Sequence, residues 1–253
     1  TNRHIGERVM VLTRFGGYAD AMNVPEATLW PVPSDWSFAQ AAAYPVQALT
    51  AWYGIERLGN ARKDSLVLVQ SAAGGVGLIA CQWAKALGAT VIGTTSSEAK
   101  AQLARANGCD HVINYNEEDF VERVKQISRN ELCDVVYDGV GKDTFFASLD
   151  CLMPRGMMVS YGNASGPVPA FQITVLIPGV GRAARADVLG DAAELHEAYP
   201  ALDEASGEEA AAREVGGCGV VETVEPSGGG GFAIQGEGLR GAQLHPGGKL
   251  VGV

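Results

Sequence analysis

The chain has 253 residues, 47% of them hydrophobic, so it is long enough to bury one large core or two small ones. A formal net charge of −10 at pH 7 argues against the phosphate contacts that nucleic-acid binding requires, and favours small-molecule partners. No apolar stretch is long enough to span a bilayer, and the N-terminus lacks the layout of a signal peptide. We therefore expect a globular protein of the cytoplasm with no membrane span.

The first 60 residues predict short strands followed by helix. Strands are expected at Val9–Leu12 and Met22–Val24, and Ser37 is expected to cap a helical turn over Phe38–Ala43. A second helical piece is expected over Thr50–Leu58. The run GERVMVL comes almost at once and has nothing before it to pair with, which suggests a fragment of a longer protein.

From Ser65 onward, strand and helix patterns alternate, which predicts an α/β fold with a doubly wound parallel sheet of the Rossmann type. The expected strands are largely apolar runs, as in sheets covered on both faces. They are Leu66–Gln70, Thr90–Thr94, His111–Tyr115, Asp134–Tyr137 and Met157–Tyr161. The expected helices are Val76–Leu87, Glu98–Asn107, Glu117–Ile127 and Lys142–Cys151. Beyond about Leu176 the alternation stops, and residues 177–253 form a poorly specified tail rich in Gly and Ala.

The segment Ser71–Gly77 is the motif most indicative of chemistry, because it joins the first of these strands to a helix. Gly74 lets the backbone approach a pyrophosphate, and Gly77 allows close contact between helix and strand. The helix N-terminus offers free N–H groups to the phosphates. Glycine-rich turns also occur for packing alone, but within a βαβ unit this one predicts nucleotide binding.

The end of the second strand favours NADPH over NADH. An NAD site usually has Asp or Glu there, but this chain reads Thr95-Ser96-Ser97-Glu98. The hydroxyl of Ser96 or Ser97 and the ammonium of Lys100 would suit a 2′-phosphate. Alternatively, Ser97 is only a helix cap and Lys100 a solvated surface residue. Glu98 is a complication, because its carboxylate would repel the same phosphate.

Other polar residues give weaker indications. Tyr115 ends one predicted strand and Asn163 follows another, both at the carboxyl edge of the sheet, where each could contact a cofactor or simply pack. The histidines and the five cysteines have no ligand-like spacing, so neither a metal site nor a disulfide framework is expected. Cys81 is expected to act as a small buried hydrophobe.

Four segments resemble the zinc-free quinone oxidoreductases of the medium-chain dehydrogenase/reductase superfamily: SAAGGVGLIACQWAKALGA, VINYNEEDF, DVVYDGVGKDTF and SLDCLMPRGMMVSYGNASG. The similarity extends from about Gly6 to Leu176, although RFGGYADAMNVP is similar to vesicle-membrane-protein relatives in the same superfamily. The resemblance implies a remnant of a GroES-like substrate domain over residues 1–50 and a Rossmann domain over residues 51–176. It also implies a stretch before Gly6 that is absent here, and an ordered end in place of the present tail, which a frameshift or true divergence would explain.

The resemblance further implies an enzyme, an NADPH:quinone oxidoreductase that passes hydride to a quinone or related conjugated carbonyl without a metal. We also expect a homodimer. An enoyl or alkenal reductase of the same superfamily, or a non-catalytic, crystallin-like NADPH-binding protein, remains the alternative. Carried over by position, Tyr53 would border the substrate, and the cofactor would be bound by Thr50, Ala73, Gly74, Gly75, Val76, Gly77, Ser96, Lys100, Tyr115, Val140, Gly162 and Asn163.

Overall fold

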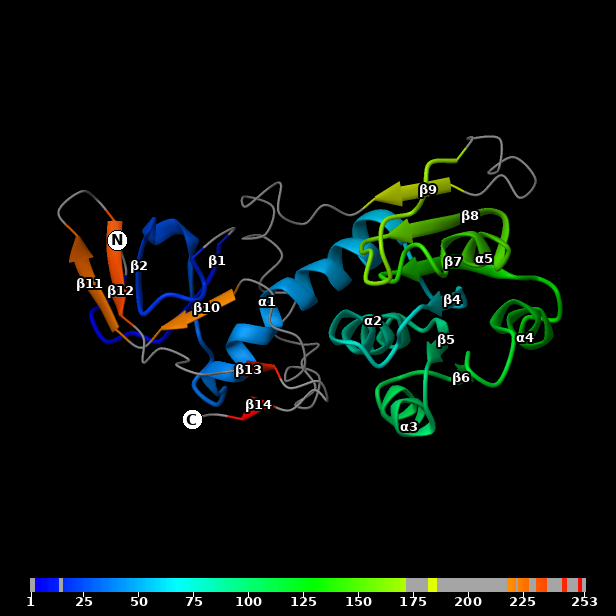
Figure 1. Ribbon diagram of the computed structural model, residues 1–253, viewed down its shortest axis with the longest axis horizontal. Coiled ribbons are helices and arrows are strands. Elements are labelled where there is room, and N and C mark those ends of the chain that lie inside the picture. Colours follow the sequence, from blue (N-terminus) through cyan, green and yellow to red (C-terminus); the bar gives the residue numbers. More distant parts are fainter. Residues whose placement is uncertain are drawn as a thin grey trace. The chain divides into compact units, whose positions relative to one another are not determined.

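The alternation of strand and helix predicted from Ser65 onward is present in the computed structural model (Figure 1). The structure describes residues 3–13 and 16–171, and beyond them the backbone of strands at 182–185, 218–221, 223–227, 231–235, 243–244 and 250–251. The chain divides into two units, one made of residues 1–46 and 211–253 and the other of residues 47–210. The larger unit carries the parallel sheet.

The sheet has six parallel strands in the order β6-β5-β4-β7-β8-β9. In sequence order along the sheet this is 3-2-1-4-5-6, the strand order of the Rossmann fold. The strands are β4 (Leu66–Val69), β5 (Thr90–Thr95), β6 (His111–Asn114), β7 (Cys133–Asp138), β8 (Leu152–Ser160) and β9 (Arg182–Arg185). The predicted fold class is confirmed. The sixth strand, β9, was missed because the sequence after Leu176 has no apolar period from which to predict it.

Helices cover both faces of the sheet. They are α2 (Gly75–Ala86), α3 (Glu98–Ala106), α4 (Phe120–Ile127) and α5 (Phe145–Leu149). Figure 1 shows α4 and α5 on the side of the sheet opposite α2. Helix α3 shares the face of α2, because Gln82 of α2 donates a hydrogen bond to Asn107 at the end of α3 (3.0 Å) and Cys81 of α2 contacts Cys109.

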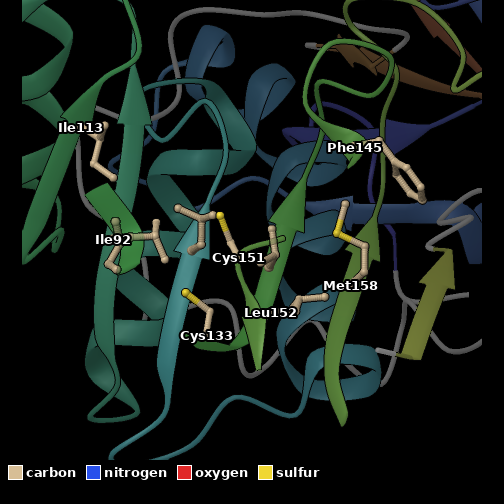
Figure 2. Packing of buried hydrophobic residues seen from close by; sticks show 10 residues of the cluster. Ile92, Ile113, Cys133, Phe145, Cys151, Leu152 and Met158 are labelled. Atoms are coloured by element: carbon tan, nitrogen blue, oxygen red, sulfur yellow. The ribbon is translucent and has the colours of Figure 1, made fainter. Parts of the chain in front are cut away.

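The strand register explains how one face forms a continuous core. Leu68 pairs with Ile92 on one side and Val136 on the other, and Val136 pairs with Met158, so all four point to the same face. All four are fully buried, and they form one hydrophobic cluster with Val124 of α4, Phe145 of α5, and Ile113, Cys133, Cys151 and Leu152 (Figure 2). Burying each large apolar side chain stabilises the fold by about 1.5–3 kcal/mol. The alternate residues Val67 and Val69 are buried on the opposite face, which is why these strands are apolar throughout.

Several predicted boundaries were wrong by a few residues. Helix α4 begins at Phe120 rather than Glu117, because the Asp119 carboxylate caps it by accepting hydrogen bonds from the backbone N–H groups of Val121 (2.8 Å) and Glu122 (3.1 Å). Strand β8 begins at Leu152 rather than Met157, and its register with β7 shifts between Cys133 and Val135. Helix α5 is shorter than predicted and begins at Phe145.

The two helical pieces predicted between Phe38 and Leu58 form one longer run. Helix α1 (Phe38–Trp52) continues through Pro45 and passes into η2 (Tyr53–Gly59), a π-helix. Ser37 caps α1 as predicted, since Gln40 N donates to Ser37 Oγ (3.2 Å) and Ser37 N donates to Gln40 Oε1 (2.8 Å). Buried side chains on both sides of Pro45, such as Ala43 and Ala48, hold the helix together despite the backbone hydrogen bond that a proline removes.

The smaller unit consists of antiparallel strands and a 3₁₀ turn, η1 (Glu26–Thr28). One sheet has the order β10-β1-β3 and another β11-β12-β2, and β13 pairs with β14. Val9, Val11, Val24 and Leu29 form the buried cluster of this unit. Its strands are β1 (Val9–Leu12), β2 (Ala21–Val24), β3 (Leu29–Pro31), β10 (Cys218–Val221), β11 (Thr223–Ser227), β12 (Gly231–Gln235), β13 (Gln243–Leu244) and β14 (Leu250–Val251).

The rest of the predicted tail over residues 177–253 lies outside the described residues. In the part of the chain that is described, no helix has the length and apolarity needed to cross a membrane.

Candidate dinucleotide site

The candidate site lies at the carboxyl edge of the parallel sheet, where β4 and β7 are neighbours but their following helices go to opposite faces. In doubly wound sheets, ligands bind in the crevice outside such a switch point. The chain that follows each of the strands β4 to β8 begins at this edge. Every sequence-predicted site residue except Thr50 and Tyr53 lies at the end of one of these strands or in the segment that follows it.

The first segment is the loop after β4. Ser71 has φ of +55°, a left-handed conformation that is uncommon for a residue with a side chain. Ala72 N donates to Thr94 O of β5 (2.9 Å) and Gly74 N donates to Ser71 O (2.9 Å), which closes a tight turn. Helix α2 begins at Gly75, with Gly74 as its cap and no side-chain hydrogen bond to its first turn. The first backbone N–H groups of a helix have no partner within it, so those of Gly75, Val76 and Gly77 are available to an anion.

A side chain would meet different surroundings at each of the three glycines of this loop. A Cβ at Gly77 would lie 2.9 Å from Ala72 Cα and still closer to Ser71 O, so the end of β4 leaves no room for a side chain. A Cβ at Gly75 would collide with the buried side chain of Gln47 on α1. A Cβ at Gly74 would meet only Ser71, with 3.2 Å to its backbone oxygen. Packing therefore explains Gly75 and Gly77, whereas at Gly74 close approach of a ligand remains the better reason. Ala73 lies in the same turn and is half-buried.

The second segment follows β5. Thr95 is buried at the strand end and no acidic residue stands there. Ser97 is the cap of α3, because its hydroxyl accepts a hydrogen bond from Lys100 N (3.4 Å). The structure thus shows Ser97 as the helix cap, one of its two predicted roles, and Ser96 beside it is half-buried. Lys100 is exposed one turn into α3.

Tyr115 lies directly beside this segment. It follows β6, its backbone N–H donates to Thr95 O (3.1 Å), and its side chain is 49% exposed. Asn116 Nδ2 donates to Ser96 O (2.8 Å), which ties the two strand ends together. Tyr115 thus lies at the carboxyl edge of the sheet with about half of its side chain exposed.

The loops after β7 and β8 are joined to each other. Tyr161 N donates to Asp138 O (3.0 Å), Ala164 N donates to Gly139 O (3.2 Å), and the backbone N–H of Ser165 donates to Val140 O (2.8 Å). A Cβ at Gly162 would lie 2.6 Å from Gly139 O, so glycine is required for this approach. The predicted residues Val140, Gly162 and Asn163 are thereby brought together.

Thr50 and Tyr53 come from α1 and η2. Thr50 is buried, and Tyr53 is half-buried with its ring 6.2 Å from the ring of Trp52. The next residue, Gly54, packs against Tyr137 of β7 and Val159 of β8, since a Cβ there would lie 3.7 Å from each. These two predicted residues therefore lie where α1 passes into η2, the helix that packs on β7 and β8.

A buried polar network behind these loops was not predicted. Asp138 at the end of β7 is fully buried, and its carboxylate accepts hydrogen bonds from Val140 N (2.7 Å), Gly141 N (3.0 Å), Thr144 Oγ1 (2.7 Å) and Ser148 Oγ (3.1 Å). Gln70, at the end of β4, donates through Nε2 to Ser148 Oγ (3.0 Å) and accepts from Thr94 Oγ1 (2.6 Å). The sequence signal was a polar residue at the carboxyl end of each of three strands, Gln70 after β4, Thr94 in β5 and Asp138 in β7.

The four cysteines whose side chains the structure describes are all buried. Cys81 is fully buried, as predicted, and a hydrogen bond with Cys109 together with burial raises the pKa of its thiol. Burial likewise raises the pKa of Cys133, and that of Cys151 to about 12. Within the described residues there is no group of three or more His, Cys, Asp or Glu side chains that could hold a metal ion.

Residues 75–204, just over half of the chain, match the family described as zinc-binding dehydrogenase. The chain belongs to this family. It is 50% identical over 173 residues to a quinone oxidoreductase of Salmonella typhimurium, which covers 68% of this chain and 53% of the relative. It is 44% identical over 169 residues to a 2-haloacrylate reductase of a Burkholderia species, covering 66% of this chain and 51% of the relative.

Among solved structures, the Escherichia coli quinone oxidoreductase complexed with NADPH matches with a TM-score of 0.68 and 42% sequence identity, covering 75% of this chain and 60% of that one. The resemblance to quinone oxidoreductases of the medium-chain dehydrogenase/reductase superfamily is confirmed by these similarities. The chain spans about half the length of the curated relatives it matches.

Proposed function

We propose that this chain binds NADPH and belongs to an oxidoreductase that transfers hydride from it to a quinone or a related conjugated carbonyl. The observation that carries the proposal is the carboxyl edge of the sheet. There a Rossmann switch point adjoins a glycine turn at a helix N-terminus, and the neighbouring strand end has hydroxyls and Lys100 in place of an acid. Similarity to quinone oxidoreductases, one of them complexed with NADPH, supports the same reading.

The residues present fit this cofactor in three places. The backbone N–H groups of Gly75, Val76 and Gly77, with the turn at Ala73 and Gly74, suit the pyrophosphate. Ser96 and Lys100 suit the 2′-phosphate, and Tyr115 suits the adenosine side.

The joined loops of Val140, Gly162 and Asn163 would line the nicotinamide half of the crevice, with Thr50 near the ring and Tyr53 toward the substrate. When bound, NADPH supplies the hydride. The protein then contributes position and exclusion of water, and it needs few acid–base groups.

We further propose that residues 1–50 are part of a GroES-like substrate domain and residues 51–176 form the dinucleotide domain. Residues 177–253, predicted as a poorly specified tail, contribute β9 to the sheet of the dinucleotide domain and strands that pair with β1 and β2. We also propose that the protein is a cytoplasmic homodimer. Chromatography with light scattering tests the dimer.

The function is tested by titrating the chain with NADPH and NADH and by following NADPH oxidation with 1,2-naphthoquinone. NADPH binding at least tenfold tighter than NADH binding, with quinone reduction, is the expected result. Reduction of an enal or enoyl thioester but not of the quinone would favour the enoyl or alkenal reductase. Binding without turnover of either acceptor would favour a non-catalytic NADPH-binding protein, and absence of NADPH binding would refute the proposal.

A further inference from the structure

A continuous chain of buried hydrogen bonds connects the loop after β4 with the loop after β7. It runs from Ser71 N to Thr94 Oγ1 (3.1 Å), from Thr94 Oγ1 to Gln70 Oε1 (2.6 Å), from Gln70 Nε2 to Ser148 Oγ (3.0 Å), and from Ser148 Oγ to Asp138 Oδ2 (3.1 Å). The side chains of Gln70, Thr94, Ser148 and Asp138 are at most 1% exposed.

The hydrogen bonds of this series all point the same way, so the donor and the acceptor of each bond are fixed. A hydroxyl has one proton to donate, and both oxygens of the Asp138 side chain accept hydrogen bonds, two of them from backbone N–H groups. Ser148 therefore donates to Asp138 and accepts from Gln70, which orients the Gln70 amide with its oxygen toward Thr94. Thr94 then donates to Gln70 and has a lone pair free to accept from Ser71 N. Asp138 is the acceptor in which the chain ends.

Both ends of this chain set backbone conformation at the crevice. At one end, Ser71 is held at φ of +55°, a conformation that persists only where its surroundings impose it. At the other end, Asp138 Oδ1 accepts from Val140 N (2.7 Å) and Gly141 N (3.0 Å), which shapes the loop after β7. Since Gly74 N donates to Ser71 O, the conformation of Ser71 determines where the first turn of α2 begins.

We propose that Gln70 and Thr94 are positioning residues for the dinucleotide. They touch no part of it, but they hold Ser71 in the conformation that aims the N–H groups of α2 at the pyrophosphate, and they tie that loop to the loop after β7. This inference rests on the proposed function, because it presumes that a dinucleotide occupies the crevice.

The test compares two pairs of variants of the whole chain. Thr94→Val removes the hydroxyl at nearly constant volume, and Thr94→Ser keeps it. Gln70→Met removes both ends of the amide. Val124→Ala is the control, a truncation on the buried side of α4, away from the loops. Affinities for NADPH and NADH are measured by fluorescence titration, the exchange rate of the Ser71 amide by hydrogen exchange without cofactor, and stability by urea unfolding.

We expect Thr94→Val and Gln70→Met to weaken NADPH and NADH binding alike, by about tenfold, because both cofactors carry the pyrophosphate. The Ser71 amide should exchange faster in both variants. Thr94→Ser should keep both the affinities and the protection, and Val124→Ala should lose stability without losing affinity.

Three results would overturn the proposal: unchanged affinities and Ser71 exchange in Thr94→Val, an equal loss of affinity in Thr94→Ser, or an equal loss in Val124→Ala. If Gln70→Met does not fold, the comparison of Thr94→Val with Thr94→Ser tests the proposal by itself. If the unmutated chain binds neither cofactor, the proposed function fails. The Ser71 exchange rates would then still show whether Gln70 and Thr94 hold the loop.

Discussion

The carboxylate of Glu98 is paired with the guanidinium of Arg105, with 2.9 Å between Oε1 and Nη1. The two residues lie seven apart on α3, and both side chains are about half exposed or more. From the sequence, the Glu98 carboxylate was expected to repel a 2′-phosphate bound near Lys100. In the structure this carboxylate is directed toward Arg105, further along the same helix.

Lys100→Ala should weaken NADPH binding by about tenfold or more and leave NADH binding nearly unchanged. A hydrogen bond to a charged group contributes about 1.5–3 kcal/mol, and about 1.4 kcal/mol corresponds to tenfold in affinity. Fluorescence titration of both cofactors measures the difference. Lys125→Ala is the matched control, since Lys125 is an exposed lysine on α4, paired with Glu122. Equal losses for the two cofactors would mean that Lys100 supports the fold or the pyrophosphate instead.

Gly74→Ala and Gly77→Ala should separate binding from folding. At Gly77 the new methyl group meets backbone atoms of Ser71 and Ala72, so unfolding in urea should show a loss of about 1–3 kcal/mol. At Gly74 the methyl group would lie 3.2 Å from the backbone oxygen of Ser71, a much milder contact than at Gly77, so the loss of stability should be smaller than at Gly77 while NADPH affinity falls. If Gly74→Ala bound NADPH as the unmutated chain does, close approach of the pyrophosphate at this position would be disproved.

Tyr137→Phe should leave stability unchanged or raise it by about 1 kcal/mol. The hydroxyl of Tyr137 is buried against η2, and no hydrogen bond reaches it from the described residues. A buried polar group without a partner costs free energy that phenylalanine does not incur. Urea unfolding measures the change, with Tyr115→Phe at an exposed site as the control. A clear loss of stability would show that the hydroxyl has a partner in the folded protein, such as a bound water molecule.

The free energy of unfolding should fall as the pH rises above about 9, and it should fall less steeply in Cys151→Ala. Burial, reinforced by the carboxylates of Asp150 and Asp119, raises the pKa of Cys151 from 9.0 to about 12. A raised pKa means that the unfolded chain releases its proton first. The contribution of Cys151 is therefore fully present below pH 9 and is lost between pH 9 and about 12, by up to roughly 1 kcal/mol per pH unit. Urea unfolding from pH 8 to 10.5 should show a shallower slope in the variant, and parallel slopes would contradict the assignment.

The sequence predicted the sheet well because the strands are covered on both faces. Runs such as Leu66–Val69 are apolar throughout, and the turns between them carry glycine, so the alternation was visible without knowledge of long-range contacts. Element ends were less predictable. The cap at Asp119 and the passage of α1 through Pro45 depend on local competition between caps and on burial in the folded chain.

The candidate site was predicted in its local parts and missed in its long-range parts. The turn at Gly74 and the missing acid after β5 are properties of contiguous residues. The network from Thr94 through Gln70 to Asp138 joins residues up to 78 positions apart, and which polar side chains meet is decided only by strand order. The packing reason for Gly75 is also long-range, because a Cβ there would collide with Gln47. The motif Ser71–Gly77 accounts for the same glycine by cofactor binding and gives no sign of this contact.

The neighbouring positions of β4 and β7 also bear on how the chain folds. Asp134 of β7 accepts a hydrogen bond from Leu66 N at the start of β4 (2.7 Å), although 68 positions separate the two residues. Contacts between residues so far apart form late, because the entropy of closing the intervening loop opposes them until β5 and β6 have formed. Until then one edge of β4, the most apolar strand of the sheet, is unpaired and can recruit strands from other chains. We therefore expect aggregation during refolding to increase with the time for which this edge is unpaired. Low temperature and low protein concentration should reduce it.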